Sequence, residues 1–154
     1  MRKLLFVLLA LSLILPASAT AMKIHPGVGL GFSADGGTVF LVGGNMGFEV
    51  HPMFRMVFEG GYGRGGNANH FWAGGGTDIF FLPNKKLIAQ PYAYGSGGYR
   101  HSPNQNGGYV RFGGGVEFNL KAPVIPYAEI GGIIYFGGGT QGAFNLMGGI
   151  RFNL

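Results

Sequence analysis

The chain has 154 residues and a formal net charge of +5, and only 11% of its residues are charged although 47% are apolar. Ordinary soluble domains carry roughly 25% charged residues, so this chain has too few charges to cover a soluble surface. Glycine accounts for 32 residues and aromatics for 14%, a composition that fits neither collagen nor a disordered linker. The chain contains no cysteine, which excludes disulfides, thiolate metal sites and a catalytic thiol.

The N-terminal segment has the features of a secretory signal. Two basic residues precede the apolar run Leu4–Leu15, and small residues suitable for cleavage follow around Ala19 and Ala21. The apolar run is shorter than the roughly 20 residues that a membrane-spanning helix needs. We therefore expect residues 1–21 to be a signal peptide for Sec-dependent export, cleaved near Ala19 or Ala21, and residues 22–154 to form one domain.

After the signal, the chain consists of alternating apolar and polar runs separated by turn-forming residues, which is the pattern of short β-strands. Seven of the runs have a central glycine doublet or triplet, so the pattern is an internal repeat of strands. The eight predicted strands cover approximately residues 26–33, 38–51, 54–64, 69–82, 87–100, 108–120, 123–136 and 141–153.

The run Tyr109–Leu120 shows the pattern most clearly, because one of its faces is apolar and the other holds Arg111 and Glu117. Its end, Gly114–Leu120, is repeated with small changes as Gly148–Leu154 at the C-terminus.

The links between the runs are short, and those after the second, fourth and sixth runs contain proline. Short links require antiparallel neighbours, and an even number of strands can close on itself and remove the open edges. The predicted fold is therefore all-β, an eight-stranded antiparallel up-and-down barrel with glycine-rich strands. The longest link of the prediction, around His101–Gly107, is still short.

Sorting the residues of each run by face separates apolar side chains from charged ones. The few charges have both signs, which suits a narrow barrel interior where carboxylates meet guanidinium groups, while the apolar face contacts lipid. We expect these groups to form a structural network that plugs the barrel, although the same groups could line a conduction path. The predicted interior polar network is Glu49, Arg55, Glu59, Asp78, Arg111, Glu117, Glu129 and Arg151.

Outward-facing phenylalanines occur in pairs near the two ends of the even-numbered runs. Eight strand residues tilted in a barrel span about 20 Å, close to the roughly 25 Å apolar band of membrane barrels. We predict a lipid-facing aromatic girdle of Phe40, Phe48, Phe71, Phe81, Phe112, Phe118, Phe144 and Phe152.

These features resemble the small eight-stranded outer-membrane β-barrels of the OmpA transmembrane-domain and OmpX type, over essentially all of residues 24–154. The resemblance rests on the signal, the strand count, the alternation, the glycine-rich strands and a C-terminus that ends in a strand. It implies a transmembrane barrel in the outer membrane of a Gram-negative cell, with both termini in the periplasm. It also implies contact with outer-membrane lipid and lipopolysaccharide, and with the barrel-assembly machinery during biogenesis.

Other functions have weaker support in the residues. His101 and Ser102 invite comparison with outer-membrane lipid A deacylases, but adjacent strand residues point to opposite faces and no acidic residue is near. The four histidines lack metal-binding spacing, and no basic cluster indicates nucleic-acid binding. We predict no catalytic residue, cofactor or metal, and an outer-membrane protein with a structural or surface role. A narrow pore or transporter for small hydrophobic compounds, or a soluble periplasmic ligand-binding barrel with its faces reversed, stay open as alternatives.

Overall fold

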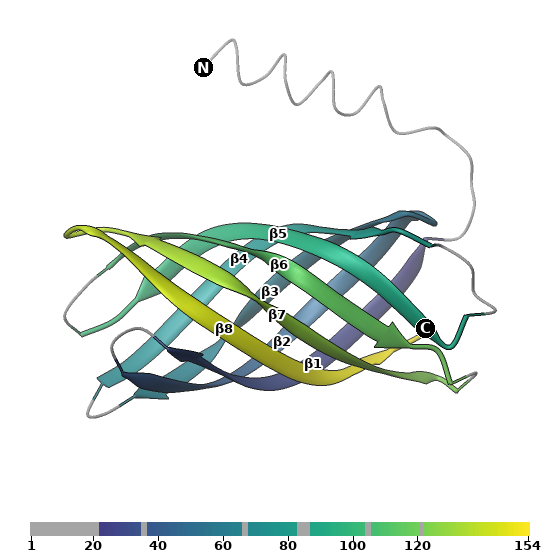
Figure 1. Ribbon diagram of the computed structural model, residues 1–154, viewed down its shortest axis with the longest axis horizontal. Coiled ribbons are helices and arrows are strands. Elements are labelled where there is room, and N and C mark those ends of the chain that lie inside the picture. Colours follow the sequence, from purple (N-terminus) through teal and green to yellow (C-terminus); the bar gives the residue numbers. More distant parts are fainter. Residues whose placement is uncertain (1–21, 35–36, 66–67, 83–86, 104–105, 121) are drawn as a thin grey trace, which may run out of the picture.

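The computed structural model describes residues 22–34, 37–65, 68–82, 87–103, 106–120 and 122–154, so the predicted signal peptide lies outside the described residues. These residues form a closed barrel of antiparallel strands (Figure 1). The strands are β1 (Lys23–Ala34), β2 (Thr38–His51), β3 (Phe54–Gly65), β4 (Ala68–Phe80), β5 (Ala89–His101), β6 (Gly107–Phe118), β7 (Val124–Phe136) and β8 (Thr140–Phe152).

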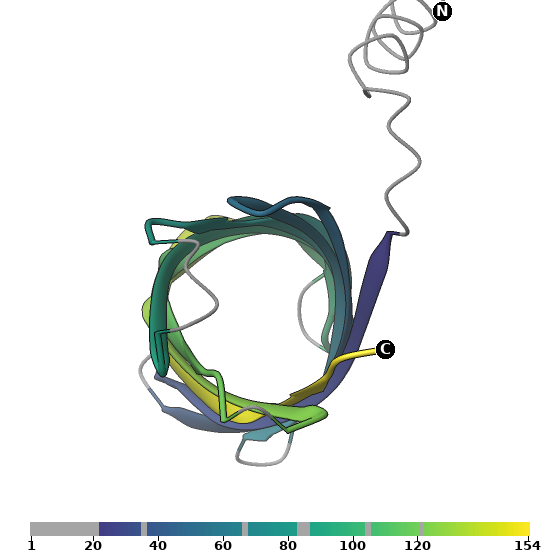
Figure 2. The same cartoon turned by 90° about the vertical axis from the view of Figure 1, so that its right-hand side faces the viewer.

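Each strand pairs with the next along the chain, and β8 pairs with β1 to close the barrel. The start of β1 and the end of β8 lie at the same end of the barrel (Figures 1 and 2). We call this the terminal end; there β2 is also followed by β3, β4 by β5 and β6 by β7. At the opposite, distal end β1 is followed by β2, β3 by β4, β5 by β6 and β7 by β8. No helix within the described ranges is long and apolar enough to cross a membrane.

The predicted closed antiparallel barrel is thus confirmed, and the predicted strand limits need small corrections. β1 begins at Lys23 instead of residue 26, and β5 begins at Ala89 instead of residue 87. As a consequence, the longest connection is 81–88 at the terminal end, and not the predicted one around His101–Gly107. The last ladder pair between β4 and β5 is Phe80↔Tyr92, but apolar and polar side chains keep alternating in the sequence beyond it. The prediction from this alternation therefore made the two strands longer than they are.

Three prolines lie inside strands, each where one neighbouring ladder has just ended. Pro26 precedes the first β1–β8 pair, at Gly27. Pro91 and Pro126 lie one residue outside the β4–β5 and β6–β7 ladders, which end at Tyr92 and Tyr127. Proline has no backbone N–H to donate and is tolerated in sheets at such edges. The barrel therefore accommodates these prolines without losing a ladder hydrogen bond.

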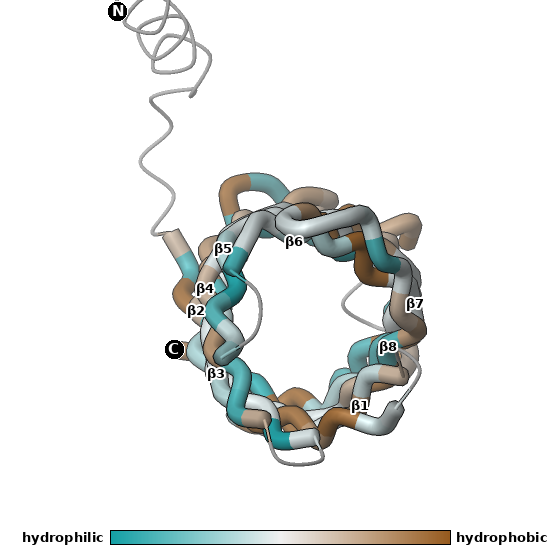
Figure 3. The backbone as a smooth tube through the Cα atoms, turned by 90° about the vertical axis from the view of Figure 1, so that its left-hand side faces the viewer, coloured by the Kyte–Doolittle hydropathy of each residue, from teal (hydrophilic) through white to brown (hydrophobic). Residues whose placement is uncertain are grey.

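The two faces of the sheet differ sharply, because buried and exposed side chains alternate along the strands. Hydrophilic and hydrophobic residues accordingly follow one another along the backbone (Figure 3). Large apolar side chains point outward and are exposed, including Leu30, Phe58 and Ile130 at 53–56%. Charged side chains such as Arg151 and Glu117 point inward and are buried. This is the reverse of a soluble barrel, and it agrees with the predicted assignment of the faces.

The open ring of the ribbon in Figure 2 is filled by side chains, and inward-facing glycines make room for them. A Cβ atom on Gly29 would clash with the hydroxyl of Tyr127, and one on Gly74 would clash with the hydroxyl of Tyr109. An eight-stranded barrel is only just wide enough for its interior side chains. The glycine repeats therefore shape the lumen so that large aromatic rings fit inside it. Further inward tyrosines lie over glycines in the same way: Tyr92 over Gly115, and Tyr94 over Gly113 and Gly131.

Candidate functional site in the barrel lumen

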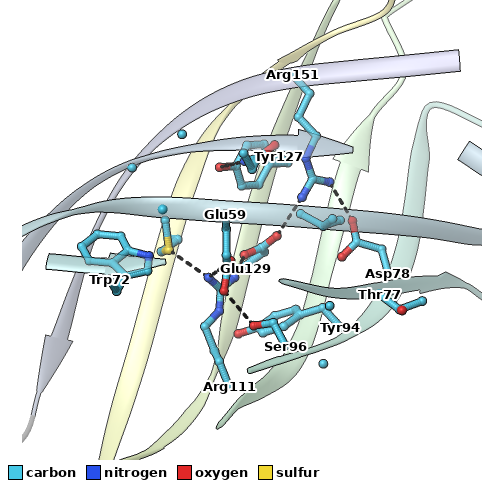
Figure 4. A pocket seen from close by; sticks show the side chains of 18 residues that line it. Glu59, Trp72, Thr77, Asp78, Tyr94, Ser96, Arg111, Tyr127, Glu129 and Arg151 are labelled. Atoms are coloured by element: carbon cyan, nitrogen blue, oxygen red, sulfur yellow. Dashed lines mark hydrogen bonds and ion pairs between the residues drawn. The ribbon is translucent and has the colours of Figure 1, made fainter. Parts of the chain in front are cut away.

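The candidate site is a cluster of ionic side chains in the middle of the lumen. Seven of the eight residues of the predicted network lie in it, and they come from β3, β4, β6, β7 and β8. Figure 4 shows part of the cluster, with Arg111 and Arg151 directed toward the carboxylates between them. We call these residues the ionic plug: Arg55, Glu59, Asp78, Arg111, Glu117, Glu129 and Arg151.

In the terminal half of the plug, Glu117 accepts hydrogen bonds from two arginines. Arg55 binds it with both terminal nitrogens, at 3.1 Å from Nη2 to Oε2, and Arg151 Nη1 donates to Oε1. Asp78 lies beside the same pair of arginines, at 3.3 Å from Arg151 Nη1 and 3.6 Å from Arg55 Nη1. Two-pronged guanidinium–carboxylate pairs of this kind are among the strongest hydrogen bonds in proteins.

In the distal half, Arg111 joins two carboxylates. Its Nη1 lies 2.8 Å from Glu59 Oε2, and its Nη2 donates to Glu129. Arg151 Nη2 donates to the other oxygen of Glu129 at 3.2 Å, so Glu129 links the two halves of the plug. Each of the three arginines is therefore shared between carboxylates from different strands.

Hydroxyl groups complete the coordination of these carboxylates. Glu59 Oε1 accepts from Ser96 Oγ at 2.8 Å and from Tyr109 Oη at 3.1 Å. Tyr92 Oη donates to Glu129 Oε1 at 2.7 Å. Burying an ion is costly unless it is paired and hydrogen-bonded, and the plug satisfies both requirements at these oxygens.

Aromatic rings cover the guanidinium groups. Arg55 lies 4.8 Å from the ring centre of Phe80, and Arg111 lies 4.6 Å from that of Tyr94. Arg151, which is 2% exposed, lies 4.4 Å from the ring centre of Tyr127. Such contacts contribute favourable cation–π energy when they are desolvated.

The predicted polar network consisted of charged residues alone and did not include these lumenal tyrosines. The signal was available, because each lies at an even spacing from a charged or amide residue of the polar face, as Tyr109 does from Arg111 and Tyr127 from Glu129. The predicted lipid-facing girdle consisted of phenylalanines alone, and the tyrosines were given no role. In the structure, the hydroxyl group and the glycine opposite place these rings inside.

The eighth predicted residue, Glu49, lies outside the plug and closer to the terminal end. Its Oε2 is 3.4 Å from Nε2 of the buried His25. Glu49 therefore belongs to the lumen, where its contact with His25 lies nearer the terminal end than the seven residues of the plug.

The plug leaves little free space along the lumen. The cavity beside it, lined by residues such as Asp78, Tyr94 and Glu129, has a volume of about 30 Å³. A second cavity, on the distal side of Arg111, has about 40 Å³. One water needs about 10–15 Å³ on this measure, so each cavity holds only about two to four water-sized groups.

The eight phenylalanines of the predicted girdle all lie on the outer face. Seven of them are exposed, with Phe81 reaching 58%. Phe48 is half-buried because it packs edge-to-face against Phe58, with ring centres 5.9 Å apart.

The residues considered for catalysis and metal binding lie apart. His101 is exposed at the end of β5 while Ser102 is buried, so their side chains diverge. Ser102 is held by its backbone, whose N–H lies 3.3 Å from Asn106 Oδ1. Across the described ranges, no three His, Asp or Glu side chains converge as a metal site requires.

Comparisons with known proteins agree on the fold. No family model matches the chain, and no curated protein matches it in sequence. Among solved structures, the Neisserial surface protein A (NspA) is similar with a TM-score of 0.64 and 10% identity, over 86% of this chain and 97% of that one. The outer membrane enzyme PagL is similar with a TM-score of 0.60 and 13% identity, over 83% and 99%.

The N-terminal β-barrel domain of Pseudomonas aeruginosa OprF is similar with a TM-score of 0.57 and 11% identity, over 83% of this chain and 97% of that one. This chain has the fold of small eight-stranded outer-membrane barrels. At these identities the likeness concerns the fold alone, and membership in the OmpA and OmpX type stays a resemblance.

Proposed function

We propose that this chain is an integral outer-membrane β-barrel protein with a structural or surface role, whose lumen is closed by the ionic plug. The observation that carries the proposal is the inverted distribution of side chains, with an apolar outer face and an ionic interior. Its fold neighbours NspA and OprF support the same assignment, as proteins of the same architecture.

The outer face argues for lipid as the surrounding medium. Its exposed apolar side chains run around the barrel, on β1 with Leu30, on β3 with Phe58 and on β7 with Ile130. Soluble proteins rarely expose contiguous apolar patches of more than a few hundred Å². A soluble periplasmic barrel that binds a ligand inside would need the opposite distribution, so this alternative has no support in the structure.

The placement of the chain ends gives the proposed orientation. Both ends of the barrel chain lie at the terminal end (Figure 1). With that end in the periplasm, the four distal connections face outward, and lipopolysaccharide and other outer-membrane lipids contact the apolar face. The barrel-assembly machinery inserts the chain after Sec-dependent export and cleavage near Ala19 or Ala21.

A pore is disfavoured by the plug itself. A path for solutes would have to break the Arg111–Glu129 and Arg151–Glu117 ion pairs, and the cavities on the way are water-sized. The test is current recording across planar bilayers that contain the purified protein, with a known porin as positive control. We expect no discrete conductance steps. Regular steps in the wild-type protein would refute the closed lumen and favour the narrow pore or transporter.

Catalysis is also not part of the proposal. PagL shows that this fold can support an enzyme, but here His101 and Ser102 diverge and neither lies beside a carboxylate in the contacts that the structure shows. Mass spectrometry of lipid A from cells that express the protein tests this point. Unchanged acylation is expected, and loss of an acyl chain would overturn the non-catalytic assignment.

A further inference from the structure

Arg100 is a charged residue of the lumen that the ionic plug does not use. It lies on the inner face near the distal end of β5, directly opposite Trp72 in the β4–β5 ladder. Its Nη2 is 2.9 Å from Nδ1 of His70, and its guanidinium lies 4.1 Å from the ring centre of Tyr135. Among the described residues, no carboxylate pairs with it, whereas every arginine of the plug is shared between carboxylates. Arg100 therefore brings a positive charge without a counter-charge into the distal lumen.

The guanidinium of Arg100 is held in place but still has donors to offer. Its hydrogen bond to His70 engages Nη2 alone, and Nδ1 of the imidazole is the acceptor because arginine only donates. Its Nε and Nη1 have no partner among the described residues, and they are not enclosed as the Nε atoms of the plug arginines are. The side chain is half-buried, so these N–H groups can be reached from the lumen. A guanidinium with accessible N–H groups in a fixed plane matches a carboxylate.

An apolar cavity lies beside Arg100 and is partly open. Its volume is about 40 Å³, which corresponds to about three water-sized groups, or to a chain of about three carbons. Its apolar lining includes Leu41, Trp72, Ile133 and Met147. A smaller hollow of about 10 Å³ borders Arg100 at Gly107 and Gly108, at the distal start of β6. Arg100 therefore borders the apolar cavity and also faces the distal mouth of the barrel.

The polar groups at the inner end of the cavity determine which end of a ligand enters. Glu59 lines the cavity there, and its Oε2 lies 2.8 Å from Arg111 Nη1. Its Oε1 already accepts from Ser96 and Tyr109. A second anion at this depth would be repelled by Glu59 and would find the nearby guanidinium already paired. The inner part of the cavity therefore suits an apolar group, and the anion belongs at Arg100.

We propose that the distal lumen binds a short-chain monocarboxylate, with its carboxylate on Arg100 and a tail of about three carbons in the apolar cavity. His70 and Tyr135 hold the guanidinium in position for this contact. The site goes beyond the structural role proposed above and requires neither conduction nor catalysis.

The test uses Trp72, the only tryptophan of the chain, which lines the cavity opposite Arg100. The full barrel is placed in phosphatidylcholine nanodiscs, which leave both of its ends open to the medium. Butyrate is titrated at constant ionic strength up to about 100 mM, because so few atoms give modest affinity. We expect a saturable change in tryptophan fluorescence. Acetate, which keeps the charge without the tail, and butyramide, which keeps the tail without the charge, are each expected to bind at least tenfold more weakly.

Two variants assign the effect to Arg100. Arg100→Gln removes the charge and is expected to weaken butyrate binding at least tenfold. The matched change Arg64→Gln, at an exposed arginine on the outer face near the distal end of β3, leaves the affinity unchanged. Heat-dependent gel mobility shows that each variant is folded. If Arg100→Gln does not fold, the comparison of the three ligands in the wild-type barrel decides the question.

A linear, non-saturating response to butyrate in the wild-type barrel would overturn the proposal. Equal affinity for acetate would reduce the site to an adventitious anion contact, and equal affinity for butyramide would reduce it to an apolar cavity, so either result would also overturn it. Unchanged butyrate affinity in folded Arg100→Gln would do the same. Because the heat-dependent mobility is recorded on the same samples, a failure of this site is distinguished from a failure of the barrel assignment.

Discussion

The arginines show how single residues hold this barrel together. Arg151 is in contact with Asp78, Glu117 and Glu129, and it lies over the ring of Tyr127. Removal of one member of such a buried set leaves its partners charged and unpaired, which costs more than the pair itself contributes. The stability of the plug therefore depends on its completeness.

Replacing Arg151 by alanine should lower the free energy of unfolding by about 3–5 kcal/mol, the usual cost of breaking a buried ion pair. Arg111→Ala should act in the same direction, because Glu59 and Glu129 lose their shared partner. Urea unfolding in lipid vesicles, followed by gel mobility, measures the change. Arg64→Ala is the matched control, because Arg64 is exposed on the outer face and should alter stability by less than about 0.5 kcal/mol. Unchanged unfolding in both plug variants would refute a structural role for the network.

The contact between Gly29 and Tyr127 allows a second test at single residues. A methyl group at Gly29 would clash with the Tyr127 hydroxyl, so Gly29→Ala should cost about 1–3 kcal/mol of overpacking. Tyr127→Phe removes the clashing oxygen, and the double variant should recover part of the loss in the same unfolding assay. Gly142→Ala is the control, since a Cβ there meets nothing within 4 Å. Strictly additive losses in the double variant would show that the ring does not occupy the space over Gly29.

At the scale of elements, alternation and glycine spacing were sufficient to place all eight strands, since side chains must alternate wherever two faces meet different media. Strand ends were less predictable. The outward residues Phe81, Leu87 and Ile88 continue the apolar pattern beyond the last β4–β5 pair, so periodicity alone could not show where the two strands end. The positions of Pro26, Pro91 and Pro126 do indicate where ladders end, because each of these prolines lies one residue outside a ladder.

The positions of the prolines imply a rule: a strand accepts proline where a neighbouring ladder has ended, and not between two complete ladders. Leu30 pairs with Val42 on β2 and Gly148 on β8, so Leu30→Pro removes a backbone donor between two complete ladders. In lipid an unsatisfied backbone group costs several kcal/mol, and we expect the loss to be at least ~2 kcal/mol. Pro26→Ala, at the edge of the same strand, should change stability by less than ~1 kcal/mol. Refolding yield and urea midpoints report both, and equal effects at the two sites would contradict the rule.

At the scale of the whole molecule, barrel closure and the direction of the two faces followed from the sequence, whereas the partners across the lumen did not. Arg55 and Glu117 are 62 residues apart, and they meet because the closed barrel turns the inner faces of β3 and β6 toward the same lumen. The alternation of side chains along a strand predicts that both residues point inward. It does not predict how far along the barrel axis each side chain lies. For the same reason, the sequence did not show that Glu49 lies beside His25, nearer the terminal end.

The proposed position in a bilayer predicts a dependence on depth. Ile130 lies at the middle of β7 and faces outward, so Ile130→Arg should cost about 2–4 kcal/mol, as at a bilayer midplane. Phe136, the last residue of β7, also faces outward, and Phe136→Arg should cost only ~0–1 kcal/mol near the interface. Urea unfolding in vesicles gives both values. A small cost at both positions would mean that water, and not lipid, surrounds the barrel.

The central claim is that the chain forms a closed barrel in the outer membrane with its apolar face in lipid. The most direct measurement is gel mobility of the protein from the outer-membrane fraction, boiled and unboiled in SDS. Closed membrane barrels satisfy all backbone hydrogen bonds within the sheet and resist SDS until heated. We predict that the protein is found in that fraction and that its mobility shifts on boiling. Recovery in the soluble fraction without a shift would contradict the claim.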